Sequence, residues 1–202
     1  MKIDFDNLDR HDCHQLLVGM VTPRPIAWVS TVGEDGIFNL APFSFFGGLG
    51  SKPPFLYISI GSRRGEKKDT LRNIEYAGDF VVNVVDESLA EKMNQTSASY
   101  PASVSEFTEV GLTPLPSDKV KSPRLAESPI SMECKLDRIL EFGDSIDVNM
   151  VAIGEIVRAH VRDDVLSNGV VDPSKLKAIA RLGADFYCRS GDLFEMKRPT
   201  HP

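Results

Sequence analysis

Two apolar, strand-like segments flank the dipeptide Asp35-Gly36, and this pattern constrains the fold most strongly. Residues 26–32 (IAWVSTV) are rich in β-branched and aromatic side chains, and residues 37–46 resume the pattern after the turn. Asp-Gly between two such segments is a strong hairpin signal, so we expect two antiparallel strands that are neighbours in one sheet. Pro42 cannot donate to a ladder, so the second strand is predicted to be an edge strand or to be bulged there.

The rest of the chain continues as short apolar segments joined by short turns, with few helical patterns. We expect further strands at residues 55–60, 80–85, 132–140, 149–160 and 193–196, a loop at 47–54 and a turn at 142–144. Short helices are expected at residues 13–20, from Asp69 or Thr70 to 76, and at 87–94, 105–110 and 174–180. This order favours a mainly β fold, an antiparallel β-barrel with peripheral helices, over a parallel βαβ sheet. The proline- and serine-rich stretch 96–129 is predicted to be a surface excursion within a single domain spanning 1–202.

Composition limits the classes of function. The chain has 202 residues, 42% hydrophobic and 26% charged, with a net charge of -6. These values are ordinary for a globular domain, and the negative charge argues against general binding of nucleic acid or anionic membranes. We find no run of about 18 apolar residues that would predict a membrane span, and no secretory signal. Three widely spaced cysteines without a CxxC motif predict reduced thiols, and together these features predict a cytoplasmic protein.

Metal and nucleophile motifs are weak. His11, Cys13 and His14 have a spacing that a metal ion could use on a helix, but third and fourth ligands are missing from the pattern. We therefore interpret this segment as a solvated helix and predict no metal site. The sequence also contains no GxSxG, GxxxxGK[ST] or GxGxxG motif, which argues against a serine hydrolase, a triphosphate-binding loop and a dinucleotide-binding Rossmann domain.

A basic loop precedes one of the predicted helices and suggests a phosphate site. Residues 61–68 contain Arg63, Arg64, Lys67 and Lys68, and the helix would begin at Asp69 or Thr70. Such a loop could be a solvated hairpin tip. Its position between a buried strand and a helix N-terminus favours phosphate, because that terminus presents free N–H groups and partial positive charge. Lys68 would add a cation and Thr70 a hydroxyl donor.

Small polar residues interrupt the apolar strands near Pro42. Ser30, Thr31 and Asn39 could simply be outward-facing positions of the strand alternation. Alternatively, an edge that is bulged at Pro42 would expose backbone groups to the polar rim of a flat ring. Together with the basic loop, this edge suits a planar, phosphorylated ligand, and FMN is the leading candidate. Ser44, Ser59 and Gly61 lie where a hydroxyl or a bare backbone could approach such a ligand, whereas Trp28, Phe43, Phe45 and Phe46 are mostly expected in the core.

Several segments in a consistent order resemble the flavin reductase-like family, whose domain is an FMN-binding split barrel. These segments are PRPIAWVSTVGEDGIFNLAPFSFF at 23–46, SKPPFLYISIG at 51–61, KDTLRNI at 68–74, FVVNVV at 80–85, and the stretches 106–136 and 180–199. The resemblance implies a six-stranded antiparallel split β-barrel. It also implies a homodimer with FMN near the interface, so that each site would include residues of both chains.

The resemblance also assigns roles to residues. Those implied to line the flavin are Ser30, Thr31, Asn39, Leu40, Ala41 and Pro42. Those implied around the ribityl phosphate are Ser44, Ser59, Gly61, Lys68, Asp69 and Thr70, with Arg63 contributing charge. Arg181 and Tyr187 are expected to reach the flavin or to close its pocket. The chain departs from many relatives at Ala184, where they carry a glycine.

The implied reaction is hydride transfer from NADH or NADPH to the flavin, followed by electron transfer to a partner monooxygenase, a redox protein, free flavin or oxygen. Because the flavin supplies this chemistry, no catalytic acid–base pair is expected. Three alternatives stay open at this point. The chain could be a flavoredoxin-like FMN electron carrier without NAD(P)H reductase activity, a pyridoxamine-phosphate oxidase-like enzyme, although that family's motifs are not found, or a barrel that binds no flavin.

Overall fold

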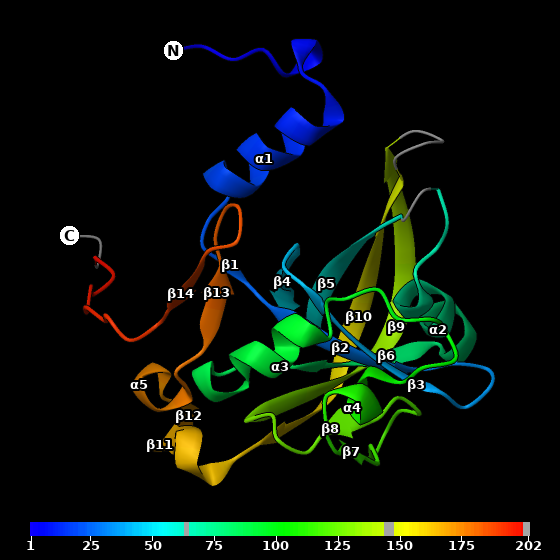
Figure 1. The fold of residues 1–202 in the computed structure, drawn as a ribbon. Coiled ribbons are helices and arrows are strands. Elements are labelled where there is room, and N and C mark those ends of the chain that lie inside the picture. Colours follow the sequence, from blue (N-terminus) through cyan, green and yellow to red (C-terminus); the bar gives the residue numbers. More distant parts are fainter. Residues whose placement is uncertain (63–64, 144–147, 200–202) are drawn as a thin grey trace.

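The computed structural model describes residues 1–62, 65–143 and 148–199, and its centre is a seven-stranded antiparallel sheet (Figure 1). The strand order is β3-β2-β6-β9-β10-β5-β4. The bounds are β2 (Ala27–Val32), β3 (Phe38–Phe43), β4 (Phe46–Ser51), β5 (Pro54–Gly61), β6 (Asp79–Asn83), β9 (Ile130–Gly143) and β10 (Val148–Val161). The predicted mainly β class is confirmed.

The predicted hairpin around Asp35-Gly36 joins β2 to β3. The two strands pair without a register shift from Ala27 opposite Phe43 to Val32 opposite Phe38. β3 is an edge strand, as Pro42 predicted, but its pairing with β2 shows no bulge. The Leu40 backbone N–H points away from β2 to the side chain of Glu106. Since N–H directions alternate along a strand, Pro42 occupies a second position of this kind, where no ladder bond is lost.

The prediction of a loop at 47–54 is wrong, because most of this segment forms β4. Its strand pairs with β5 from Phe46 opposite Ile58 to Ser51 opposite Pro54. Three glycines give β4 a low strand propensity, but the exposed edge of β5 supplies backbone partners. β3 and β4 lie at the two ends of the sheet and yet follow each other directly through Ser44 and Phe45. The sheet must therefore curl strongly to bring its ends together.

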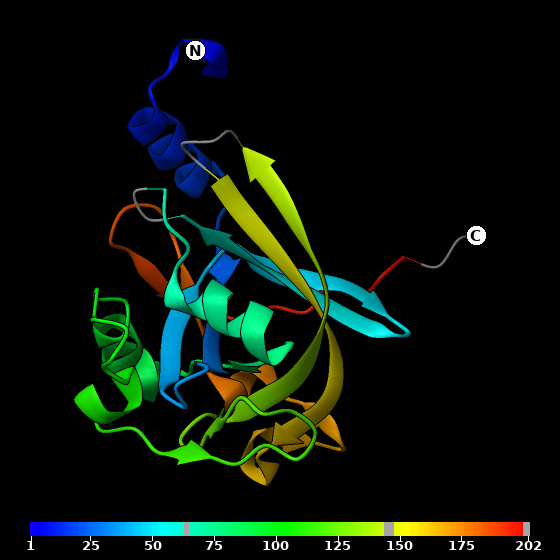
Figure 2. The same cartoon turned by 90° about the vertical axis from the view of Figure 1, so that its right-hand side faces the viewer.

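The helices lie around this sheet. α1 (Arg10–Met20) and α3 (Ala90–Gln95) confirm two predicted helices, and α4 (Glu106–Glu109) is a third. α2 (Asp69–Ala77) packs against β2, β3 and β6 through Leu71 and Ile74 (Figure 2). Its N-cap residue is Lys68 rather than Asp69 or Thr70, and Gly78 ends it in the left-handed conformation with φ 73°. No helix within the described ranges is long and apolar enough to cross a membrane.

The C-terminal part differs from its prediction. α5 (Pro173–Leu176) stops early because Lys177 adopts a left-handed conformation, and the residues predicted to continue the helix form a strand. This strand, β13 (Ile179–Arg181), pairs with β14 (Tyr187–Arg189) and with β1 (Arg24–Pro25) in a three-stranded sheet. Residues 193–196, predicted as a strand, have no regular structure and no strand partner. The predicted turn at 142–144 falls partly outside the described residues, since β9 continues to Gly143.

Two apolar clusters stabilise the molecule. One lies between α2 and the main sheet and includes Phe43, Phe80 and Ile74. The other includes Trp28, Leu40 and Phe107, and lies under α3, α4 and the excursion 96–129. The excursion contains the short strands β7 (Pro114–Leu115) and β8 (Arg124–Leu125). The short strands elsewhere are β11 (Leu166–Ser167) and β12 (Val170–Val171), and the 3-10 turns are Phe5–Asn7, Glu87–Leu89 and Asp163–Val165. All three cysteines are free, as predicted.

Candidate functional site

A large cleft of about 1370 Å³, here called the large cleft, lies beside the corner between β3 and β4. Its other borders are α1, the end of β5 and the β13–β14 hairpin. Of the residues predicted for the site, it brings together Pro42, Ser44, Ser59, Gly61 and Lys68, and also Arg181 and Tyr187. These residues come from four separate parts of the chain, so the fold assembles what the sequence showed only as scattered motifs.

The corner at Ser44 and Phe45 and the end of β5 form one side of the large cleft. The Ser59 backbone N–H donates to the Phe45 carbonyl at 2.8 Å, which fixes the corner against β5. At Gly61 an added Cβ would lie 3.3 Å from Asn149 Oδ1, so the glycine allows close approach of backbone and side chain. Next to it, the buried Ser62 Oγ has no hydrogen-bond partner among the described residues. Ser62 follows Gly61 in the chain but does not itself line the large cleft.

Positive charge predominates on the walls of the large cleft. Among the described residues, four cations line it, Arg10, Arg24, Lys68 and Arg181, against the single carboxylate of Asp185. Lys68 lies where α2 begins, with its Nζ 5.7 Å from the centre of the Phe43 ring. A helix N-terminus next to a lysine is a favourable site for an anionic group such as phosphate.

The β13–β14 hairpin carries a second cationic group into the large cleft. The Arg181 guanidinium lies 4.6 Å from the centre of the Tyr187 ring and donates to the Tyr187 hydroxyl and to the Ala184 carbonyl. Ala184 itself adopts φ 50°, a left-handed conformation that is costly for a residue with a Cβ. This explains in physical terms why a glycine suits this position.

Four predicted residues do not line the large cleft. Ser30 and Thr31 are fully buried. The Ser30 hydroxyl donates to the Pro123 carbonyl, and the Thr31 hydroxyl accepts from Asn73 of α2. The Asn39 amide donates to the Thr70 hydroxyl at 3.1 Å. These side chains therefore hold β2, β3, α2 and the excursion together, and neither Ser30 nor Thr31 lines the large cleft.

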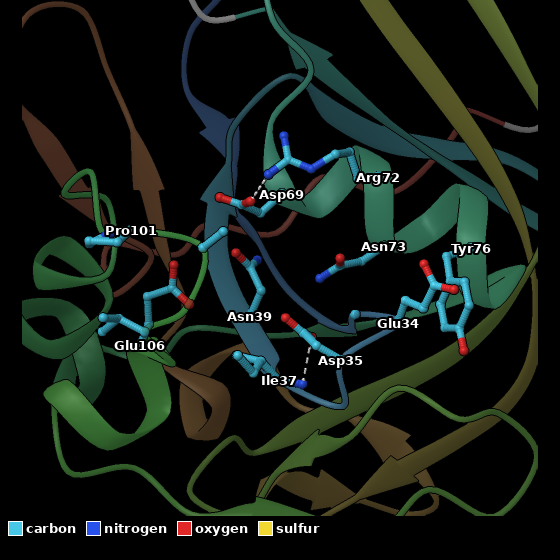
Figure 3. Close-up of a pocket in the computed structure, with 13 residues that line it drawn as sticks. Glu34, Asp35, Ile37, Asn39, Asp69, Arg72, Asn73, Tyr76, Pro101 and Glu106 are labelled. Carbon is cyan, nitrogen blue, oxygen red and sulfur yellow. Dashed lines mark hydrogen bonds and ion pairs between the residues drawn. The ribbon is translucent and has the colours of Figure 1, made fainter.

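A smaller pocket of about 450 Å³, here called the acidic pocket, lies between the β2–β3 turn, α2 and residues 101–106 (Figure 3). Asn39 and Asp69 line it, together with the carboxyl groups of Glu34, Asp35 and Glu106. Asp69 is paired with Arg72. Burial raises the pKa of Glu106, although the Leu40 N–H that it accepts works in the opposite direction. Four carboxyl groups line this pocket against the one cation of Arg72, so it disfavours a phosphate, in contrast to the large cleft.

The remaining predicted residues have simple placements. Leu40 is fully buried, and Ala41 packs against the α2 core cluster. Arg63 lies outside the described residues. Among the aromatic residues, Trp28 and Phe43 are buried as expected, and Phe45 lines the large cleft.

Sequence reasoning missed several residues of the large cleft. α1 forms as predicted, but its side chains His11, Cys13 and His14 line the cleft rather than only facing solvent. Arg24 and Asn149 were also missed. A charged residue between two prolines directly before a buried strand was the available signal for Arg24. In the described parts of the chain, only Asp118, Glu133 and His160 bring three potential metal ligands within 4.8 Å of one another.

Comparison with known proteins agrees with this geometry. Residues 17–179 match the model of the flavin reductase like domain. The structure is similar to nitrilotriacetate monooxygenase component B from Bacillus cereus, with a TM-score of 0.94 and 35% identity over 97% of this chain and 98% of that one. It is also similar to 2-nitrobenzoate 2-nitroreductase from Pseudomonas fluorescens, with a TM-score of 0.90 and 34% identity over 99% and 97%.

A third similar structure, from Shewanella frigidimarina, is described as a flavin reductase with a split barrel domain; the TM-score is 0.84 and the identity 26%, covering 98% of this chain and 100% of that one. The family model alone spans most of the chain, and it includes the corner, the end of β5 and the start of α2 that shape the large cleft. The chain belongs to the flavin reductase-like family.

Proposed function

We propose that this protein binds FMN in the large cleft and uses it to oxidise NADH or NADPH. The observation that carries the proposal is the contrast in charge between the two pockets beside α2. Among the described residues, the large cleft has four cationic side chains and one carboxylate, whereas the acidic pocket has four carboxyl groups and the single cation of Arg72. A ligand with a phosphate tail is therefore favoured in the large cleft. When bound, the flavin would supply the hydride and electron chemistry.

The residues present fit such a ligand. Lys68 and the start of α2 would hold the phosphate. Ser44 and Ser59 offer hydroxyl groups, and the edge formed by Pro42 offers backbone groups to a ring. Thr31, Asn39 and Thr70 would support the site from within the protein, through the hydrogen bonds that fix β2 and β3 to α2, and Ser30 through its bond to Pro123 of the excursion.

The size of the large cleft favours a second ligand. Cavities that hold one small molecule usually have volumes of roughly 300–1,000 Å³, and this cleft has about 1370 Å³. Space would therefore remain beside a bound flavin for a nicotinamide ring. Since no separate nucleotide-binding motif is present, we propose that NADH or NADPH binds transiently in this space.

We further propose a homodimer of six-stranded split barrels. If β3 and β4 are counted as one strand bent at Ser44 and Phe45, the seven strands become six, and this bent strand would close the barrel; the direct succession of β3 and β4 supports this proposal. α1 stands apart from the main sheet (Figure 1), and Val18 is its only buried residue. Leu17 and Met20 expose apolar side chains beside the large cleft. A second copy packed on this helix would cover them and complete the wall of the site.

The experiment that tests the proposal begins with binding. FMN is titrated into the flavin-free protein and the visible spectrum is followed, and oxidation of NADH and of NADPH is then measured with FMN present. We expect a saturable yellow complex and turnover above the rate of free flavin. A protein that stays colourless after addition of FMN would contradict the binding proposal, and a yellow protein without turnover would favour the flavoredoxin-like electron carrier.

The position of the phosphate is tested by Lys68→Glu. A hydrogen bond between charged groups contributes roughly 1.5–3 kcal/mol, so loss of about 2 kcal/mol would weaken FMN binding about 30-fold. Lys52→Glu is the matched control, because it makes the same change of charge in the exposed turn between β4 and β5. Equal affinities of the two variants would place the phosphate elsewhere.

One other function has specific support. The similarity to 2-nitrobenzoate 2-nitroreductase favours a small nitroaromatic compound as the electron acceptor, whereas the similarity to monooxygenase component B favours delivery of reduced flavin to a partner enzyme. Anaerobic assays with NADH, FMN and 2-nitrobenzoate distinguish the two. Consumption of the nitro compound that depends on the protein would support the nitroreductase; release of reduced flavin alone would support the flavin reductase.

A further inference from the structure

Arg24 is a buried cation in the wall of the large cleft, with only 4% of its surface exposed. It is the only buried arginine or lysine in the described part of the chain. Burial, and next the nearby charge of Arg181, lower the pKa of Arg24 from its usual value. A buried cation is costly unless its N–H groups donate hydrogen bonds. The acceptors of these hydrogen bonds therefore identify the segments that Arg24 stabilises.

The guanidinium of Arg24 joins three segments that border the large cleft. Its Nη1 donates to the carbonyls of Val18 at 2.5 Å and Val21 at 2.6 Å, at the C-terminal end of α1. Its Nη2 donates to the Leu182 carbonyl at 2.9 Å, in the turn after β13 and 158 residues away in sequence. Its Nε donates to the Ser44 hydroxyl at 3.3 Å, at the corner between β3 and β4.

Arg24 fastens α1 at its C-terminal end, where the helix is buried. The only buried residue of α1 is Val18, whose carbonyl is one of the acceptors of Arg24. Close packing at the same place is shown by Gly183, where an added Cβ would lie 3.2 Å from the Gly19 Cα. Carbonyl groups at a helix C-terminus have no partner within the helix, and Arg24 supplies the missing donors for two of them. Arg24 therefore helps to hold α1 as a wall of the cleft, beside the contact between the rings of His14 and Phe45.

The contact with Ser44 extends this role to the ligand side of the cleft. A hydroxyl oxygen that accepts from a guanidinium must direct its own hydrogen to another acceptor, because a hydroxyl has one hydrogen to donate. Ser44 lines the large cleft, so its O–H can point to an oxygen of a bound flavin. An arginine that only capped α1 would have no need of this fourth contact.

We infer that Arg24 is a positioning residue of the flavin site, which sets the orientation of the Ser44 hydroxyl and holds α1 and the Leu182 turn as walls of the cleft. This inference depends on the proposed function. It predicts that Arg24 acts on the flavin through Ser44, so that the two residues are coupled in FMN affinity. A purely structural arginine would produce no such coupling.

The experiment is a double-mutant cycle on FMN affinity with Arg24→Lys, Ser44→Ala and the double variant. Lysine keeps the positive charge but lacks the planar fork that reaches four acceptors at once. We expect Arg24→Lys to weaken FMN binding at least tenfold, Ser44→Ala to weaken it several-fold, and the double variant to bind no more weakly than Arg24→Lys alone. Arg158→Lys, which alters a distant surface ion pair with Asp118, is the control and should bind FMN normally. Fully additive effects would overturn the inference.

A second measurement does not require flavin. Hydrogen exchange of the flavin-free protein is expected to be at least tenfold faster in Arg24→Lys at residues 10–20 and 182–186, with β9 and β10 unchanged. Unchanged exchange in both segments would overturn the inference even if the wild type binds FMN. If the wild type binds no FMN, the proposed function fails while this measurement still decides whether Arg24 holds the walls. If Arg24→Lys does not fold, Ser44→Ala decides the matter, since unchanged FMN affinity in that variant would overturn the inference.

Discussion

Replacing Glu133 by glutamine tests what holds the long excursion 96–129 on the sheet. Glu133 lies in β9 and is 0% exposed, yet it carries a carboxyl group. Its two oxygens accept from the backbone N–H groups of Asp118 at 2.9 Å and Lys119 at 2.6 Å, and His160 Nε2 lies 2.6 Å from one of them. Glutamine has the same shape, but it replaces one acceptor oxygen with an NH₂ group that would face a hydrogen-bond donor.

The magnitude follows from these contacts. Hydrogen bonds to a charged group contribute about 1.5–3 kcal/mol each, and disruption of a buried charged network costs about 3–5 kcal/mol. Because glutamine keeps one acceptor oxygen, we expect Glu133→Gln to lower the free energy of unfolding by about 3 kcal/mol at pH 7. For a chain of this length the melting temperature should fall by about 6–12 °C. Urea unfolding and thermal melting measure both quantities.

The pH dependence provides an independent check. Burial by itself would raise the pKa of Glu133, but hydrogen bonds from the Asp118 N–H, from His160 and from the Lys119 N–H outweigh it and hold the pKa below its usual value. A lowered pKa in the folded state stabilises the protein above the unfolded value of about 4.3, and this contribution is lost as the pH falls through the folded-state pKa. The difference between wild type and Glu133→Gln should therefore shrink as the pH falls below about 4.3.

The control is Glu91→Gln, an exposed position on α3, which should change the free energy of unfolding by less than about 0.5 kcal/mol. A loss below about 1 kcal/mol for Glu133→Gln at pH 7 would refute the reasoning, since the buried carboxylate would then not be what fastens the excursion to the sheet.

Three further variants test separate features. Burial raises the pKa of Glu106, so the wild type should lose stability relative to Glu106→Gln as the pH rises from about 4 to 7. Urea unfolding measures this, and a difference in the free energy of unfolding that does not change with pH would contradict it. In Gly154→Ala the new Cβ would lie 2.6 Å from Cζ of the buried Phe80, so urea unfolding should show a loss of about 1–3 kcal/mol, and an unchanged midpoint would contradict the packing. Ala184→Gly removes the strain of a left-handed alanine, about 1–2 kcal/mol, but glycine makes the unfolded chain more flexible, which costs about 0.4–1 kcal/mol. Thermal melting should therefore show a gain of about 0.5 kcal/mol in the free energy of unfolding. A loss of that size would contradict it.

Elements specified by short-range signals were predictable. The Asp35-Gly36 turn joins β2 to β3 as expected, and Gly78 ends α2 at the predicted place. Pro42 correctly predicted an edge strand. In each case the deciding interaction lies within a few residues of the signal, so the sequence contains it locally.

Strands that depend on a distant partner were not predictable in this way. β4 is glycine-rich and forms because β5 offers it an edge, and β13 forms where a helix was expected because β1 and β14 flank it. Residues 193–196 have a favourable strand composition but no neighbouring strand, and they stay irregular. Strand formation depends on context more than helix formation does, since a strand needs hydrogen-bond partners outside itself.

The same division applies to the site. The sequence by itself determined the chemical character of the corner at Ser44, of the end of β5 and of the cationic start of α2, because residue types and their local order are sufficient for that. Only the tertiary structure decided that the Ser30 and Thr31 side chains face inward, that four carboxyl groups meet in a pocket between α2 and the β2–β3 turn, and that Arg24 connects α1, Ser44 and Leu182. These arrangements join residues up to 158 positions apart, and no local pattern records such contacts, because they form only when the whole sheet has curled and packed.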